Sequence, residues 1–387
     1  MEATLPDGGE HIKEADSPLL QLYCPVNEED FVFAKVTNRV KQFTKITRIQ
    51  HFPDQNQLMV SWRTGIGRVR LDSAQLDHSR DSHSKFVEFL HRPEIGGLIA
   101  SCIEIGPDMY LVHSNQSPTL IIRPGKKSVA KFRGEYWPGE IAESIQVVDG
   151  WCYWITNSNK NQPSFRTVLV RCNLAAVRQS VEAGVQELDL DLMHNEGTSL
   201  ADIDVSAESV CILVRDGEVT ERSLETPFPV LRKCRLPTFE AQVGYLRLTK
   251  TSFGFLCLCY PQGYHNQSLM LMSLSSEFPL RTTAQSYVSG ISMQNSLTMK
   301  TFENLGQVYC SVMQSCGTMI LWACSREKNQ IVWKQKLDAV DHHKDWYYTA
   351  RLLEVLTPAS GDRTKYSRLT LLCPGLAGQI YRFYLGV

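Results

Sequence analysis

Residues 315–338 read SCGTMILWACSREKNQIVWKQKLD, and this stretch decides the fold. Two runs rich in β-branched, aliphatic and aromatic residues, TMILWAC and IVWKQKL, stand on either side of the polar segment SREKNQ. Short apolar runs bounded by turn residues are typical of β-strands. The same stretch holds two cysteines and two tryptophans, so it could instead be a reactive site. Whether the pattern recurs along the chain distinguishes a repeating unit from a unique site.

The pattern does recur. Strand-like runs follow one another in groups of about four, and each group occupies roughly 40 to 50 residues, as in the blades of a β-propeller. Helical periodicity is confined to LAAVRQSVEAG at 174–184, where one short helix is expected between two strands. We therefore predict an all-β, seven-bladed β-propeller with blades at 43–90, 96–134, 141–190, 199–236, 241–284, 295–338 and 346–387.

The last group is one strand short. An open ring would leave an exposed strand edge, which invites aggregation. We therefore expect a strand from the N-terminal region to close the ring, with DFVFAKV at 30–36 as the first candidate and LLQLYCPV at 19–26 as the second. Residues 1–20 are polar and without period, which predicts a disordered tail before a single domain at 21–387.

The segment that begins at residue 315 resembles the end of a WD40-type blade: a turn, a strand ending near a tryptophan, a polar turn and a final strand. Trp322 stands at the position of the family's tryptophan, whereas Ala323 replaces its aspartate, and no Gly-His pair precedes any group. The resemblance covers most of the chain as a pattern and implies a diverged WD40-like propeller. It further implies a rigid docking platform without enzymatic activity, which serves as a subunit of a multiprotein complex.

Composition reduces the number of possible function classes further. The 40 basic and 41 acidic residues nearly balance, which excludes a general polyelectrolyte role such as coating DNA. Twelve cysteines without a secretory signal pattern predict reduced, mostly buried thiols in a cytoplasmic or nuclear protein. The longest apolar stretches are far shorter than the roughly 20 residues of a membrane-spanning helix, so no membrane span is expected.

Neither catalysis nor metal binding is predicted. Asp189 and Asp191 alternate with leucines in ELDLDLMHNE, which places both on the solvated face of an outer strand rather than in an acid/base pair. Cys257 and Cys259 would face the same way on a strand, but no second pair at zinc-site spacing completes a ligand set. We expect no cofactor, no metal and no small-molecule substrate, and we expect Cys316 and Cys324 to be inert.

A docking face is predicted from the loops. In a WD40-like strand order, the loops that join fourth to first strands and second to third strands lie on one face, the top face. Four such loops, at 134–140, 215–217, 261–267 and 340–347, carry the residue types of interaction hot spots. Burial in the core is the alternative for each aromatic residue taken alone. The expected partner-binding residues are Tyr136, Trp137, Arg215, Tyr264, His265, His342, His343, Asp345 and Trp346.

A basic run supplies the alternative function. The segment RPGKKSVAKFRG at 123–134 contains Arg123, Lys126, Lys127, Lys131 and Arg133, close to Tyr136 and Trp137. Charge combined with aromatic stacking is how single-stranded nucleic acid is held, and phosphorylated ligands would use the same cations. The other interpretation is a solvated outer strand whose charges protect a sheet edge.

Overall fold

The structure is a computed structural model. It describes residues 20–23, 46–52, 57–62, 65–70, 86–90, 99–114, 119–123, 129–133, 145–157, 167–194, 199–237, 243–261, 268–291, 297–304, 307–314, 319–325, 330–337, 354–356, 369–374 and 380–385.

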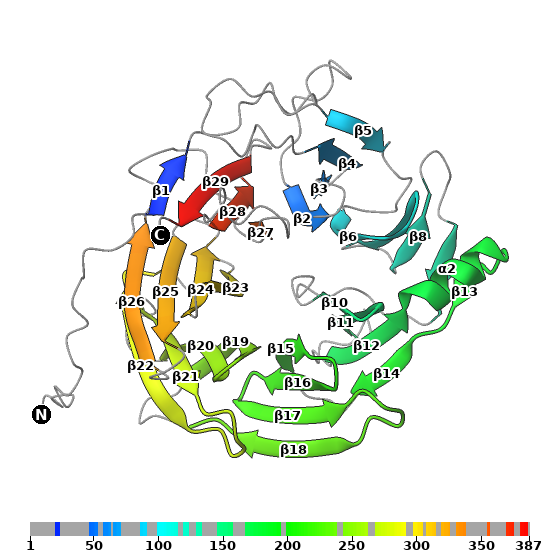
Figure 1. Ribbon diagram of the computed structural model, residues 1–387. Helices are drawn as coiled ribbons and strands as arrows, with labels where there is room; N and C mark the ends of the chain where they lie inside the picture. The colour runs from blue at the N-terminus through cyan, green and yellow to red at the C-terminus, as the bar shows by residue number, and fades with distance from the viewer. Residues whose placement is uncertain are drawn as a thin grey trace, which may run out of the picture.

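The described residues form seven sheets that stand around a common centre, each with the first strand of its group innermost (Figure 1). The first sheet comprises β2 (Ile46–Phe52), β3 (Gln57–Trp62), β4 (Gly65–Arg70) and β5 (Phe86–Leu90). The second comprises β6 (Ile99–Gly106), β7 (Met109–Ser114), β8 (Leu120–Ile122), β9 (Ala130–Phe132) and the added strand β13 (Glu187–Leu188). The third comprises β10 (Gln146–Val148), β11 (Trp151–Asn157), β12 (Thr167–Asn173) and β14 (Asp191–His194).

The remaining sheets follow the same order. The fourth comprises β15 (Leu200–Val205), β16 (Ser209–Val214), β17 (Glu218–Ser223) and β18 (Val230–Arg235). The fifth comprises β19 (Val243–Thr251), β20 (Gly254–Pro261), β21 (Ser268–Leu274) and β22 (Thr282–Ser289). The sixth comprises β23 (Leu297–Asn304), β24 (Gln307–Gln314), β25 (Met319–Ser325) and β26 (Gln330–Leu337). The last comprises β27 (Glu354–Leu356), β28 (Leu369–Pro374), β29 (Ile380–Leu385) and β1 (Leu20–Tyr23).

The core lies between the sheets. Each large cluster of buried side chains joins two neighbouring sheets, for example the fourth to the fifth through Leu213, Leu248 and Cys257. The second strand of a sheet has a neighbour on both edges and a sheet on both faces, so it is the most apolar, and every residue of β16 is buried. The outermost strand β18 has the opposite character, with five of its six residues exposed. The prediction of an all-β chain is confirmed.

The strand beside β29 comes from the N-terminal region. β1 pairs with β29 in antiparallel register, from Leu20 opposite Leu385 to Tyr23 opposite Arg382 (Figure 1). This strand lies within the second candidate, 19–26, whereas the first candidate, 30–36, lies outside the described residues. Both candidates are short, mostly apolar runs, so local pattern could not rank them. Leu20 also belongs to the strand, so the segment predicted as a tail ends before it.

The fourth strand of the third group differs from the prediction. The run GVQELDLD at 184–191 was expected to form one outer strand, but the chain divides it between two sheets. β13 adds in parallel to β9 of the second sheet, and only then does β14 pair with β12 of the third. The division occurs because Leu188 is buried in the cluster between these two sheets while its acidic neighbours contact the basic β9.

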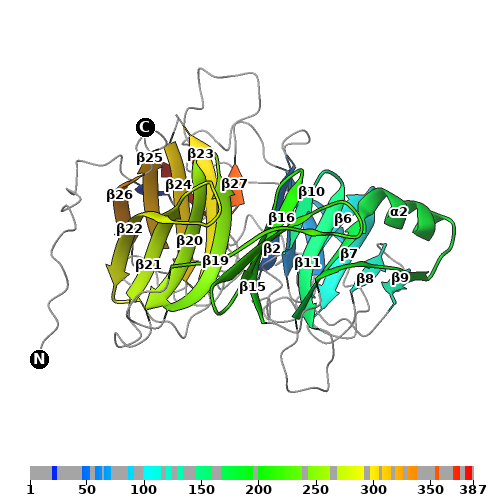
Figure 2. The ribbon, with the colours of Figure 1, turned by 90° about the horizontal axis from the view of Figure 1, so that it is seen from below.

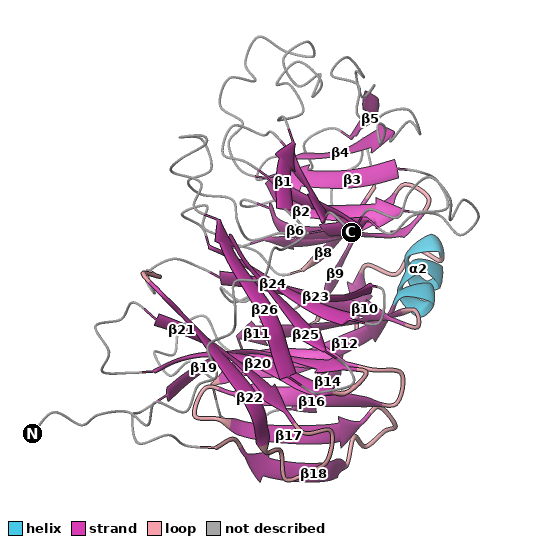
Figure 3. Cartoon of the chain, turned by 60° about the vertical axis from the view of Figure 1, so that its left-hand side comes forward, coloured by secondary structure: helices cyan, strands magenta, loops and turns pink. Residues whose placement is uncertain are grey.

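The predicted helix is confirmed. α2 (Leu174–Glu182) is the one helix among the described residues. It lies on the outer side of the sheets (Figures 2 and 3) and contacts β6 and β12. The side chain of Asn173 caps it by accepting a bond from Ala176 N at 2.9 Å. Val177 and Val181, one turn apart, are buried against the second and third sheets. The segment 174–190, α2 together with β13, is called the strap below.

Candidate docking face

Arg215 is the residue of the predicted top face that the structure describes. It is exposed in the turn between β16 and β17. The other predicted partner-binding residues lie outside the described residues and stay predictions. They are Tyr136, Trp137, Tyr264, His265, His342, His343, Asp345 and Trp346.

The backbone of the Arg215 turn is fixed from several sides. Arg215 N donates to Ser199 O at 3.0 Å, and Gly217 N donates to Val214 O at 2.9 Å. Asp216 accepts a bond from Glu218 N at 3.1 Å and pairs with Arg235 at 2.9 Å. The turn therefore presents an exposed guanidinium on an ordered backbone, which lowers the entropy lost when a partner binds.

Gly217 packs this turn closely against the next sheet. Its φ is +90°, a conformation that favours glycine, and a Cβ built on it would lie 2.3 Å from the ring of Tyr245 on β19. Burial raises the pKa of the Tyr245 hydroxyl, which stays protonated and donates to Pro237 O at 2.8 Å. The sequence RDG predicted a turn, but only the fold shows that its glycine leaves space for a neighbouring ring.

Part of the basic run is already paired with carboxylates of the same chain. Lys131 pairs with Glu187 at 3.0 Å, and Arg133 lies 3.7 Å from Glu187 and 3.4 Å from Asp189. Arg123 is partly buried, and Lys126 and Lys127 lie outside the described residues. Two of the five predicted phosphate-binding cations therefore already face carboxylates of the strap. This arrangement fits the interpretation of a charged outer strand better than that of a phosphate site.

The acidic segment does not carry a carboxylate pair. Asp189 and Asp191 were expected on one face of one strand, but Asp189 lies between β13 and β14 and faces Arg133. Asp191 instead accepts a bond from Arg171 Nε at 3.1 Å within the third sheet. The expectation of a shared face is wrong because the chain passes from one sheet to the other between these two residues.

Sequence reasoning missed two contacts between an arginine and aromatic rings. The guanidinium of Arg171 lies 4.0 Å from the ring centroid of Trp151 and 4.6 Å from that of Phe228 in the next sheet. Arg232 lies 4.8 Å from the ring of Phe278, again one sheet further on. Each phenylalanine precedes a proline in the loop before a fourth strand, in FPV at 228–230 and FPL at 278–280. This repeated Phe-Pro pair is the signal that could have revealed the two contacts with phenylalanine.

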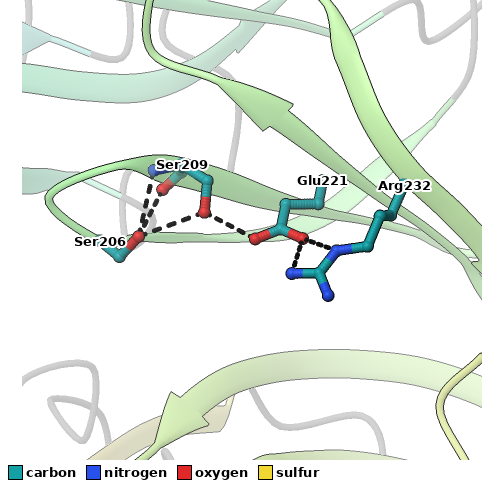
Figure 4. Close-up of polar contacts among 4 residues, drawn as sticks. All are labelled: Ser206, Ser209, Glu221 and Arg232. Atoms are coloured by element: carbon teal, nitrogen blue, oxygen red, sulfur yellow. Dashed lines mark hydrogen bonds and ion pairs between the residues drawn. The ribbon is translucent and has the colours of Figure 1, made fainter. Parts of the chain in front are cut away.

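Arg232 also completes a polar network within the fourth sheet (Figure 4). Glu221 is buried, and its carboxylate accepts bonds from Ser209 Oγ at 2.7 Å and Arg232 Nε at 2.6 Å. The Ser206 hydroxyl donates to Ser209 O at 3.0 Å. A buried carboxylate with both oxygens bonded is stable in the fold, and it fixes the outer strands against one another.

Carboxylates also join the innermost strands. Asp202 accepts a bond from Leu248 N at 3.0 Å, and Asp204 accepts one from Lys250 N at 2.6 Å, both across the gap between the fourth and fifth sheets. Burial raises the pKa of Asp204 to about 7, and the neighbouring Asp202 adds to the rise, while the bond from Lys250 N opposes it. Gln146 plays the same part between the third and fourth sheets, with bonds to Ile203 O and Val205 N.

Three of the thiols considered above are buried. Cys257, Cys259 and Cys324 have no exposed surface, and burial raises the pKa of all three, that of Cys324 to about 12. Thiols of this kind are poor nucleophiles. Cys316 lies outside the described residues. In the part of the chain that the structure describes, no group of three or more His, Cys, Asp or Glu side chains is placed to hold a metal ion.

Trp322 is a core residue. It has no exposed surface, and its Nε1 donates to Ser286 Oγ on β22 at 3.2 Å. The indole therefore joins the sixth sheet to the fifth. The opening stretch forms β25 and β26, so it is the second half of one copy of the repeating unit.

Many solved structures are similar to this chain, and two of them serve as examples. One is a chain of the S. cerevisiae complex of a Dbp5 variant with Nup159, a Gle1 variant, IP6 and ADP, at a TM-score of 0.55 and 10% identity, covering 96% of this chain and 95% of that one. The other is Saccharomyces cerevisiae Sqt1, a WD40 propeller protein, at a TM-score of 0.53 and 10% identity, covering 90% and 98%. No family model and no curated protein matches the sequence.

Likeness at this identity establishes the fold. The chain has a diverged WD40-like fold. No helix in the described residues is long and apolar enough to cross a membrane.

Proposed function

We propose that this protein is a non-enzymatic scaffold subunit of a multiprotein complex, which docks other proteins on the top face around Arg215. The observation that carries the proposal is the Arg215 turn, where an exposed arginine stands on a backbone that is bonded to Ser199, just before β15, and packs on Tyr245. Arginine is enriched at interaction hot spots, and a preordered surface binds with less entropic cost.

The architecture supports the same function. We propose that the seven sheets are the blades of a seven-bladed ring and that the pairing of β1 with β29 closes it. In a closed ring every blade packs on two others, so loops from different blades keep fixed distances. The arginine–aromatic contacts of Arg171 and Arg232 and the inner-strand bonds of Asp202 and Asp204 reinforce that packing between blades. Such a platform recognises the shape of a partner rather than transforming a substrate.

The test is affinity purification of the tagged protein from its own cells, followed by mass spectrometry. We expect partners in stoichiometric amount with the wild type, their loss with Arg215→Glu, and their retention with Arg281→Glu. Arg281 is an exposed arginine next to β22, outside the top-face loops, so it controls for the change of charge. A protein that elutes alone, or partners unaffected by Arg215→Glu, would overturn the proposal.

The remaining predicted residues extend the test. Alanine substitution of Trp137, Tyr264 and Trp346 is expected to remove the same partners without lowering the melting temperature. Nucleic acid in the purified material, released steeply between 50 and 200 mM salt, would instead support the basic run as the binding site, because phosphate contacts release counterions.

A further inference from the structure

The fourth strands of two sheets share a short motif. β9 ends in Lys131-Phe132 and is followed directly by Arg133, and β18 ends in Lys233-Cys234-Arg235. Both are the fourth strands of their sheets, and both are antiparallel to the third strand. The motif therefore occupies equivalent positions two sheets apart, with a basic residue on each side of a smaller or apolar residue that faces the core.

On β9 the motif binds an acidic strand. Lys131 N donates to Gln186 O at 2.9 Å, and Arg133 N donates to Leu188 O at 2.7 Å, so the backbone of both basic residues points to the outer edge. Their side chains contact the carboxylates of Glu187 and Asp189. Leu188, between those carboxylates, is only 5% exposed. The strap thus shows what this motif recognises: an extended segment in which a leucine stands between two acids.

On β18 the backbone has the same orientation. Leu236 N donates to Gly217 O at 2.8 Å, and Cys234 stands opposite Val219 on β17. Because N–H and C=O groups alternate between the two edges of a strand, the basic residues at 233 and 235 direct their backbone groups away from β17. This is the arrangement that Lys131 and Arg133 have on β9.

The outer edge of β18 differs from that of β9 in one respect. No strand pairs with it among the residues that the structure describes, and Figure 1 places it on the outer rim of the molecule. Val230 is 46% exposed and Leu231 is 52% exposed, which is unusual for apolar residues of a sheet.

The two cations can reach an incoming chain. Lys233 pairs with Glu218, and Arg235 pairs with Asp216 in the Arg215 turn. The basic side chains of both pairs are at least half exposed, and surface pairs of this kind contribute little to stability. An arginine or lysine also has several N–H donors, so each cation can donate to a second carboxylate without losing its bond to the first.

We propose that the outer edge of β18 binds an extended acidic segment of a partner protein, in which an apolar residue stands between two carboxylates, as a further strand of the fourth sheet. Addition of a strand to a sheet edge gives affinity through backbone bonds and specificity through side chains. This inference rests on the proposed scaffold function and adds a second contact surface, which begins beside the Arg215 turn.

The probe is a fluorescently labelled peptide with the sequence VQELDLD, a copy of residues 185–191. Its anisotropy is measured on titration with the full-length protein at low and moderate salt. We expect saturable binding to the wild type, weakened about tenfold or more by the double variant Lys233→Glu/Arg235→Glu, because like charges would then face each other. Arg281→Glu is the matched control and is expected to bind as the wild type does. The peptide VQKLKLK is expected not to bind.

Two outcomes would overturn the proposal. One is the absence of saturable binding. The other is binding that survives Lys233→Glu/Arg235→Glu but is lost in Lys131→Glu/Arg133→Glu, since the peptide would then replace the strap on β9. Co-purification separates this proposal from the scaffold function: partners retained by the β18 variant but lost with Arg215→Glu would leave the top face as the docking site.

Discussion

Asp204 is expected to make the stability of this protein depend on pH in an unusual direction. Its carboxyl has an ordinary pKa of 3.8, which burial raises to about 7 in the folded chain. At pH 8 the group is charged in both states, so the folded state bears the full cost of a partly buried charge. As the pH falls through 7, the folded protein takes up a proton that the unfolded chain does not, and stability rises.

The change in the free energy of unfolding follows from the rise in the pKa of Asp204. Between pH 8 and pH 6 the folded carboxyl passes from mostly charged to mostly neutral, while the unfolded one stays charged. This one group then adds about 1.4 kcal/mol to the free energy of unfolding, close to the energy of one pKa unit. Asp204→Asn keeps an oxygen to accept the bond from Lys250 N but does not titrate, so the variant lacks this gain.

The assay is urea unfolding, followed by tryptophan fluorescence, at pH 6, 7 and 8. The quantity of interest is the difference between wild type and Asp204→Asn, because titration of histidines affects both proteins alike. Asp189→Asn removes an exposed carboxylate and controls for the loss of one charge. An equal change of stability with pH in wild type and Asp204→Asn would refute the reasoning.

Three further substitutions test the packing between sheets, each by chemical unfolding. Arg171→Ala should lower the free energy of unfolding by about 2 kcal/mol, because its stacking on two rings and its bond to Leu224 O are lost; a neutral result would mean that the contact is incidental. Gly217→Ala should cost about 2 kcal/mol or more, since it strains a φ of +90° and meets Tyr245. Trp322→Phe should cost about 1 to 2 kcal/mol through the lost bond to Ser286, and a stability equal to wild type would argue against that bond.

The repeating strands could be predicted because each is local: a few alternating or continuous apolar residues between turns. The helix at Leu174–Glu182 could be predicted for the same reason, with Val177 and Val181 spaced by four residues. What stayed hidden depends on distant parts of the chain. Leu20–Tyr23 could not be preferred over 30–36, since its partner lies at the other end of the sequence. Likewise, the even alternation of ELDLDL does not reveal that Lys131 and Arg133 bind its first half.

In the candidate site, too, local features could be predicted from the sequence and contacts between distant residues could not. Composition and strand order suggested Arg215, and the structure finds it exposed in a turn. The contacts that hold this turn, above all Gly217 against Tyr245, connect residues of different sheets and have no local sequence pattern. The bond from Arg171 to Leu224 O and its stacking on Phe228 are equally non-local, although the repeated Phe-Pro pair marked where their partners would be.

The pairing of β1 with β29 has a consequence for the synthesis of the protein on the ribosome. Leu20 leaves the ribosome well before its partner Leu385, which lies near the other end of the given sequence. At about 5 to 20 residues per second, synthesis of the intervening chain takes roughly 20 to 70 s. During that interval β1 has no strand to join, and the sheets already made lack their final neighbour. A chain whose synthesis stops before residue 385 therefore carries a strand β1 without its partner, and an unpaired strand edge promotes aggregation.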